Sequence, residues 1–306
     1  MTRTSATDRA RKAPKRPKRR GPFARWAADT GWRHLVAILV VVFALIPIVY
    51  VVSAAFNPTG TLSATSLLPS GFSVNNFERL FTEDNIPFAR WFFNSLVIAV
   101  PAAFISIFVS SLAAYAFSRF RFKGRRPMLL FLLLIQMFPA FLSVVALYLI
   151  FGAIGDFYPV AGLNSKLGLM LVYMGGALGV STWLMKGFFD TIPKELDEAA
   201  VIDGAGHAQI FFGMILPLSA PIIAISGILA FVGTMNDFIL ASLFLTDRPE
   251  MTLAVGLKTL TAANSPASYF GVFAAGTLIT SVLTVTVFMS LQRYIVSGLT
   301  GGAVKG

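Results

Sequence analysis

The chain has 306 residues, of which 56% are hydrophobic and only 13% charged, whereas an ordinary soluble domain is roughly a quarter charged. So little polar surface cannot coat a water-soluble globule of this size, and the composition therefore predicts an integral membrane protein. The absence of cysteine excludes disulfide frameworks and thiolate chemistry. The two histidines, His34 and His207, are too few for a histidine-based metal or catalytic cluster.

The net charge of +11 is concentrated at the amino terminus. Residues 1–34 hold eleven Lys and Arg against Asp8 and Asp29, which leaves +2 for the rest of the chain. We predict that residues 1–34 form a disordered, basic cytoplasmic tail near anionic lipid headgroups, and we expect no nucleic-acid partner. A cleaved signal peptide is disfavoured, because the apolar run that follows is too long and five more come after it.

Six apolar segments approach or exceed the length of about 20 residues that a bilayer-spanning helix needs. In chain order they are Leu35–Phe56, Phe92–Phe117, Met128–Phe151, Leu167–Leu184, Leu216–Phe244 and Phe270–Leu291. The connections that share a side with the amino terminus carry 20 Lys and Arg, and the opposite connections carry 5, which predicts that both termini lie in the cytoplasm. The sequence thus predicts an all-α membrane protein with six transmembrane helices, N-in and C-in, in residues 35–297, followed by a cytoplasmic tail at 298–306.

The connection between the fourth and fifth segments, residues 186–215, is too long and too acidic for a simple connector. It holds five acidic and two basic residues on the predicted cytoplasmic side. Asp190 or Thr191 is suited to cap a helix, Gly204 is suited to end it, and a second helix follows from about Ala208. This predicted helix–bend–helix element is either a helix lying in the lipid interface or a docking element for a cytoplasmic protein. Its acidic character favours docking, because interfacial helices are usually basic.

A motif lies in this element. Glu198-Ala199-Ala200, three residues, Gly204, nine residues and Met214-Ile215-Leu216-Pro217 resemble the EAA motif, E-A-A-x3-G-x9-I-x-L-P, of permease subunits of ABC importers. Met214 replaces the usual isoleucine. From Leu35 onward the chain is most similar to maltose/maltodextrin permease subunits of the MalG type, through the stretches 136–140, 145–148, 162–164, 252–256 and 291–306.

The resemblance implies one permease half of an ATP-driven importer for maltose/maltodextrin or a related oligosaccharide, in the bacterial inner membrane. It implies three kinds of partner: a second permease subunit, two cytoplasmic ATPase subunits and an extracytoplasmic sugar-binding protein. The sequence has no G-x-x-x-x-G-K-[ST] loop, so we expect no enzyme activity and no cofactor in this chain, with ATP and Mg bound by the ATPase subunits. The alternatives are a stand-alone secondary sugar transporter, for which Asp237 is the candidate coupling carboxylate, and a membrane-embedded enzyme, which lacks a catalytic motif.

The candidate functional residues form four groups. The ATPase-coupling residues implied by the motif are Glu198, Ala199, Ala200, Gly204, Leu216 and Pro217. The residues expected to contact the sugar-binding protein are Lys258, Thr261, Asn264 and Ser265, in the loop Thr246–Tyr269. The glycine-rich end is not expected to fold alone. Its residues expected to contact the ATPases are Gly301, Gly302 and Lys305. The last group, Asn236 and Asp237, either kinks the fifth segment or lines a pathway.

Prolines and glycines predict irregularities in three segments. Pro139 is expected to interrupt the third segment, and Pro217 to bend the start of the fifth. Gly175 and Gly179 form a G-x-x-x-G pair in the fourth, which predicts tight helix packing there.

Overall fold

The computed structural model describes Trp26 and residues 30–69, 71–262 and 265–303. The chain divides into two compact units, Met1–Val49 and Tyr50–Gly306. Within the described residues the regular structure is helical and no strand occurs, which confirms the predicted all-α class.

The first unit is described mainly through the start of helix α2 (Trp32–Phe56), which contains the first predicted span. Its mean hydropathy of 3.2 is the highest among the three long membrane-competent helices of the described chain. His34 Nδ1 lies 3.0 Å from the Thr30 carbonyl oxygen. Most of the basic tail, including residues 1–25, lies outside the described residues.

The second unit contains the end of α2 and the remaining helices. The longer ones are α4 (Phe88–Arg119), α5 (Arg125–Met137), α6 (Ala140–Phe157), α7 (Lys166–Gly175), α8 (Val180–Phe189), α12 (Ala220–Asn236) and α15 (Tyr269–Ala303). The shorter ones are α3 (Asn75–Thr82), α9 (Lys194–Ile202), α10 (His207–Ile210), a π-helical turn (Phe211–Ile215), α11 (Leu216–Leu218), α13 (Ile239–Phe244) and α14 (Leu253–Thr259). Single 3₁₀ turns lie at Leu62–Ala64, Pro159–Ala161, Gly176–Leu178 and Arg248–Glu250.

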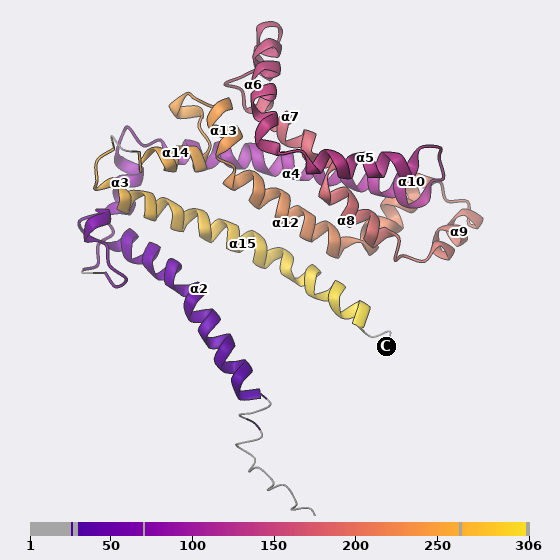
Figure 1. Cartoon of the computed structure of the whole chain (residues 1–306), viewed down its shortest axis with the longest axis horizontal. Helices are drawn as coiled ribbons and strands as arrows, with labels where there is room; N and C mark the ends of the chain where they lie inside the picture. The colour runs from indigo at the N-terminus through magenta and orange to yellow at the C-terminus, as the bar shows by residue number, and fades with distance from the viewer. Residues whose placement is uncertain (1–25, 27–29, 70, 263–264, 304–306) are drawn as a thin grey trace, which may run out of the picture. The chain divides into compact units, whose positions relative to one another are not determined.

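Helix α4 is the central element of this unit. Helices α7, α8 and α12 pack along it, and α15 packs against α12 (Figure 1). Helices α3 and α14 lie at one end of α4, whereas α9 and α10 lie at the other (Figure 1). The two predicted interaction elements are therefore separated by the length of α4.

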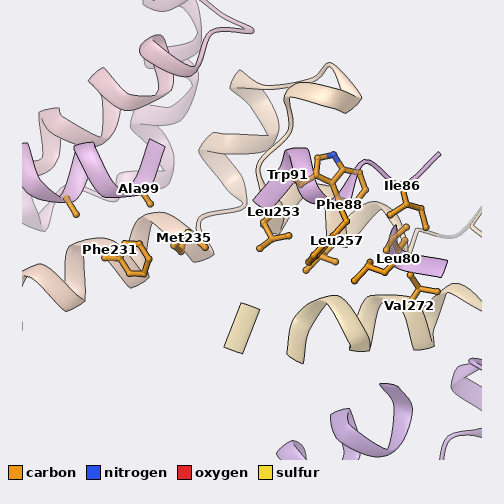
Figure 2. Close-up of a cluster of buried hydrophobic side chains, with 12 residues drawn as sticks. Leu80, Ile86, Phe88, Trp91, Ala99, Phe231, Met235, Leu253, Leu257 and Val272 are labelled. Atoms are coloured by element: carbon orange, nitrogen blue, oxygen red, sulfur yellow. The ribbon is translucent and has the colours of Figure 1, made fainter. Parts of the chain in front are cut away.

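A buried apolar cluster holds α3, α4, α12, α14 and α15 together (Figure 2). Trp91 of α4 is fully buried in it, and its indole Nε1 donates a 2.7 Å hydrogen bond to the Arg248 carbonyl. A Cβ added at Gly256 would collide with the Trp91 ring, so only glycine allows α14 to approach α4 this closely. The cluster fixes the end of the unit that carries the loop at 246–269.

Three helices of the described chain are long and apolar enough to cross a membrane unbroken: α2, α4 and the Tyr269–Tyr294 part of α15. Three further helix pairs meet the same test but are bent by 97° between α5 and α6, by 43° before α8 and by 78° before α12. If each bent pair is one span, the chain has six spans, as predicted; the N-in, C-in orientation stays a prediction.

Two of the three bends lie where the sequence predicts an irregularity. The first lies at Phe138-Pro139, where proline cannot donate the backbone hydrogen bond that would continue the helix. The break before α12 lies at Ser219, two residues after Pro217, where the sequence predicts a bend at the start of the fifth span. The prediction of tight helix packing is wrong at Gly175, because a Cβ added there would meet no atom within 4 Å. Gly179 instead lies at the bend, with its backbone against the side-chain amide of Gln136.

The carboxyl-terminal region departs from the prediction. Helix α15 continues through Gly298, Gly301 and Gly302 to Ala303, where the sequence predicted a tail unable to fold alone. Extending an existing helix adds one hydrogen bond for each residue that is fixed, which offsets part of the cost of glycine. Lys305 lies outside the described residues.

Candidate functional site

The element predicted at 186–215 is a helix, a glycine bend and a second helix. Helix α9 ends at Ile202, and Gly204 then adopts φ +85°, which is the left-handed conformation that favours glycine. Gly206 caps α10, with its backbone N–H bonded to the Gln209 side chain at 2.8 Å. The predicted caps of α9 are wrong: Pro193 takes that place, whereas Asp190 caps the end of α8.

The motif residues of α9 face in different directions. Glu198 and Ala199 are exposed. Ala200 packs against a buried cluster that includes Tyr115, Phe189 and Phe211. The outer face of α9 is also apolar at Val201 and Ile202, which are 54% and 86% exposed. Neither residue was predicted to be functional, although both lie inside the motif's x3 gap.

The second half of the motif forms the route from α9 into the membrane helices. Phe211 and Ile215 of the π-helical turn are buried against α4 and α8. Leu216 packs on the same cluster, and Pro217 is exposed at the start of α11. Because Pro217 has no N–H, the helix cannot continue its regular bonds here, and the chain turns into α12 at Ser219.

Asp190 ties the start of this element to the membrane helices. Its carboxylate accepts hydrogen bonds from Ser118 at 2.7 Å and from Lys186 at 2.5 Å. Burial raises the pKa of Asp190, but the hydrogen bonds and the charges of Lys186 and Arg125 outweigh burial and leave the pKa below its usual value. The carboxylate therefore stays ionised at neutral pH and holds α8 against the end of α4.

At the opposite end of the unit, the loop at 246–269 is mostly structured. It contains α14, whose Leu253 and Leu257 are buried in the cluster of Figure 2. Of the predicted contact residues, Lys258 is exposed in the last turn of α14 and Thr261 bonds to the Lys258 carbonyl at 3.0 Å. The Ser265 hydroxyl bonds to the Thr259 carbonyl at 2.7 Å.

In the described part of this loop, residues 258–262 and 265–268, the side chains of Thr261 and Ser265 therefore bond to the loop's own backbone. A hollow lies beside them. The hollow has a volume of about 500 Å³ and is lined by residues of 62–63 and 260–270. The fourth predicted residue, Asn264, lies outside the described residues.

Side chains outside the loop anchor both of its ends. At the start, Asn164 adopts φ +55° and its side-chain oxygen accepts bonds from the Thr246 N–H and hydroxyl at 2.9 and 2.8 Å. At the end, Arg79 donates to the Ser268 carbonyl at 3.3 Å and to Glu83 at 2.6 Å. These anchors come from distant parts of the chain, so no local sequence signal could have revealed them.

Glu83 is the centre of the second anchor. It also accepts a 2.6 Å bond from the Tyr269 hydroxyl, and the Arg79 guanidinium lies 5.1 Å from the centre of the Tyr269 ring. Burial raises the pKa of Glu83, but the bonds from Tyr269 and Arg79 and the Arg79 charge outweigh burial and leave the pKa below its usual value.

Asn236 and Asp237 interrupt the fifth segment, as predicted. Helix α12 ends at Asn236, and Asp237 turns the chain into an extended conformation before α13. Asp237 accepts hydrogen bonds from the Tyr173 hydroxyl at 3.0 Å and from the Ala241 N–H at 3.1 Å. The pair is therefore a kink, and each member also borders a cavity.

The two cavities lie on different sides of α12. Asn236 borders one of about 450 Å³, together with hydroxyls of α15. Asp237 borders another of about 400 Å³, whose other polar lining residues are Ser106, Tyr173, Ser181 and Thr234.

Comparison with known proteins identifies the family. The model of the family described as "Binding-protein-dependent transport system inner membrane component" matches residues 106–301. The chain belongs to this family. The match covers the motif and both candidate interaction elements, and it establishes the chain as an inner-membrane component of a binding-protein-dependent transport system.

Several curated members of the family resemble the chain over most of its length. The galactooligosaccharide permease GanQ of Bacillus subtilis is 39% identical, over 89% of this chain and 94% of that protein. The maltodextrin permease MdxG of the same organism is 37% identical over 89% and 95%. The maltose/maltodextrin permease MalG of Escherichia coli is 37% identical over 89% and 95%.

One solved structure shares the fold. It is a bacterial ABC transporter involved in the import of the acidic polysaccharide alginate, with a TM-score of 0.70 and 21% identity over 87% of this chain and 97% of that chain. This likeness supports the permease fold alone.

Proposed function

We propose that this chain is a permease subunit of an ABC importer for maltose/maltodextrin or a related oligosaccharide. It forms half of the translocation path and couples to ATPase subunits through α9 and α10. The observation that carries the proposal is α9 itself: an exposed helix with the apolar residues Val201 and Ile202 on its surface, ended by a left-handed glycine, in a member of a transport family. An exposed apolar face of this kind is typical of a surface that contacts a protein or a membrane, and the acidic residues of α9 favour a protein.

The proposed complex contains the partners that the family resemblance implies. Two cytoplasmic ATPase subunits bind ATP and Mg, and α9 docks on the ATPase side of the complex. A second permease subunit completes the path, and an extracytoplasmic sugar-binding protein delivers the sugar to the end of the unit that carries α14. Motion of α9 then drives α12 through the rigid packing of Phe211 and Ile215.

The cavity beside Asp237 is our candidate for this chain's wall of the path. Its carboxylate, three hydroxyl side chains and the Tyr173 ring supply the donors, acceptors and apolar face that carbohydrate recognition uses. An intramembrane carboxylate is costly unless it faces a bundle interior or a water-filled path. The hydrogen bonds from Tyr173 and the Ala241 N–H both end on Oδ1, which leaves Oδ2 available to a ligand.

The test is reconstitution of the complex in proteoliposomes with the sugar-binding protein and a panel of sugars. We expect uptake of maltodextrin that requires ATP and is not driven by an ion gradient. Galactooligosaccharide, trehalose and other α-glucosides form the other arms of the panel, because relatives carry names for more than one sugar. Uptake that follows an ion gradient without ATP, and that is lost in Asp237→Asn, would establish the secondary transporter instead.

A further inference from the structure

Arg119, the last residue of α4, connects three segments at the end of the unit that holds α9. Its Nη1 donates to the carbonyl of Phe189, the last residue of α8, at 3.0 Å. Its Nη2 donates to the carbonyl of Ile192, between α8 and α9, at 3.1 Å. Its Nε forms an ion pair with Asp197 of α9. The sequence analysis counted Arg119 only as one of several cytoplasmic positive charges.

This arrangement differs from an ordinary surface ion pair. The Arg119 side chain is 6% exposed and the Asp197 side chain 16% exposed, so both charges are largely removed from water. Removing one member of such a pair leaves the other buried without compensation, which makes the contact strongly dependent on both partners. Asp197 also lies in the first turn of α9, where the helix dipole favours a carboxylate.

The guanidinium group suits this task and an ammonium group does not. Its five N–H donors are fixed in one plane, so the two carbonyls and the carboxylate are contacted at once from a single rigid group. Ser118, which precedes Arg119 in the last turn of α4, donates a hydrogen bond to Asp190. Two consecutive residues of α4 therefore contact the segment that leads into α9.

Two routes therefore lead from α9 to the membrane helices. One follows the chain through the Gly204 bend, α10 and the π-helical turn into α12. The other crosses directly from Asp197 to Arg119 and enters α4, the helix against which α8 and α12 pack. The first route contains a glycine hinge, whereas the second is a rigid contact between side chains.

We propose that Arg119 is the positioning residue that ties α9 to α4, so that displacement of α9 moves α4 directly and in step with α12. The proposal rests on the proposed function for the source of the displacement, but the contact itself lies within this chain. Loss of Arg119 removes the direct contact with α4 and leaves α9 held only by its chain connections to α8 and α10 and by the packing of Ala200. ATP hydrolysis in the partner subunits then continues while less of the movement reaches the path.

The first test measures the ratio of sugar transported to ATP hydrolysed in the assembled complex. Arg119→Gln is expected to lower this ratio by about tenfold, within the range known for residues that couple distant sites. Arg119→Lys and Asp197→Asn are expected to lower it by less, and Arg119→Gln with Asp197→Asn together no more than Arg119→Gln alone. The matched control is Arg121→Gln, which removes the same charge at an exposed position two residues away.

A ratio unchanged in Arg119→Gln overturns the proposal, even if less complex is recovered. A merely structural role lowers the amount of complex and reduces transport and hydrolysis together, so their ratio stays constant. Additive effects of Arg119→Gln and Asp197→Asn equally contradict the single contact.

The second test does not depend on the proposed function. The chain has no cysteine, so Lys194→Cys in α9 and Lys123→Cys after α4 can be spin-labelled as a pair in the full chain, purified with its co-expressed partners. We expect a narrow distance distribution in the otherwise unaltered chain and a broadened one when Arg119→Gln is added. An equally narrow distance distribution in Arg119→Gln overturns the proposed tie between Arg119 and α9. A broadened distribution in a preparation without ATP-driven uptake would support that tie and reject only the proposed function.

Discussion

At Gly204, the conformation of one backbone carries the bend between α9 and α10. Its φ of +85° strains any residue with a Cβ, at about 1–2 kcal/mol for an L-residue in the left-handed region. An added Cβ meets no atom within 4 Å, so the strain comes from the backbone and the new side chain points into open space. In the proposed complex, that space borders the surface that receives α9.

We expect Gly204→Ala to weaken coupling and Gly204→Asp to abolish sugar uptake while ATP hydrolysis continues. Aspartate adds a charge at the docking surface as well as the backbone strain. Uptake and ATPase activity of purified complex, measured side by side, check this expectation. The matched control is Gly187→Ala, at an exposed helical glycine with open space around it and an ordinary backbone conformation. Normal uptake by Gly204→Asp in a fully assembled complex would contradict the role of the bend.

Glu83 makes the anchor of the 246–269 loop dependent on pH. Its pKa in the folded chain lies below the usual value of 4.5. The ionised form therefore stabilises the fold at pH values above about 4.5, and this contribution is lost as the pH falls through the folded pKa.

We expect the melting temperature of the purified chain to fall between pH 6 and pH 3.5 by a larger amount than in Tyr269→Phe or Glu83→Gln. Those variants lack part of the contribution at every pH, so their curves should be flatter. Glu78 of α3, the helix that ends just before Glu83, provides the control Glu78→Gln. Parallel curves for all four proteins would show that the Glu83 network does not report on folding in this pH range.

Helix existence and bend positions could be predicted from the sequence, because local signals determine them. Apolar runs predicted the membrane helices, Gly204 predicted the bend, and Pro139 and Asn236-Asp237 predicted breaks where the structure has them. The start of α9 was wrong by a few residues because Asp190 bonds to Lys186 and Ser118 instead of capping the helix.

Contacts between distant segments could not be predicted from the sequence. Arg119 with Asp197, Asn164 with Thr246 and Arg79 with Ser268 join residues far apart in the chain, and no spacing in one sequence reports such pairs. The helical continuation of α15 to Ala303 was missed for a different reason. Glycine content argued against it, whereas the long helix that precedes it supplies the nucleus that an isolated segment lacks.

The loop between α14 and α15 is the element that we expect to meet the sugar-binding protein. Replacing residues 261–267 by a Gly-Ser linker of equal length removes most of the loop side chains around the hollow there but leaves the buried Leu260 and the anchor of Arg79, Glu83 and Tyr269 in place. We expect the complex to assemble, and uptake from the sugar-loaded binding protein to fall severely. Assembly is checked by co-purification, and binding-protein stimulation of ATPase activity is the measurement.

The control for this replacement is Lys166→Gln, which breaks an ion pair with Glu250 outside the replaced residues. An exposed ion pair of this kind contributes little to stability, so the control should behave as the unaltered complex. Unchanged stimulation in the linker variant would place the binding protein elsewhere on the chain.

Across the second unit, the two interaction elements lie at opposite ends of α4 and α12 (Figure 1). A signal from one end to the other therefore has two helices to follow. Helix α12 starts at the Ser219 break and ends at the Asn236 kink, so it is a rigid segment between two bends. Helix α4 is continuous from Phe88 to Arg119, with Trp91 held in the cluster of Figure 2 at one end and Arg119 bound to α9 at the other. In the proposed mechanism, α4 moves as one rigid body and the movement changes the path at the bends that bound α12.

The end of α15 gives the last test at this scale. The helix continues to Ala303 instead of ending near Leu291, so Gly301 and Gly302 are presented on a helix and not on a loose tail. In the proposed topology this helix leaves the membrane on the side where the ATPase subunits lie, and its glycines allow another backbone to approach closely. Deletion of residues 301–306 is therefore expected to lower the ATPase activity of purified complex several-fold and sugar uptake with it. A second variant replaces Gly301 and Gly302 by alanine, which strengthens the helix but blocks close approach, and it should lower ATPase activity as the deletion does. A terminus that contacts nothing would leave hydrolysis and transport unchanged in both variants, and that result would reject the contact.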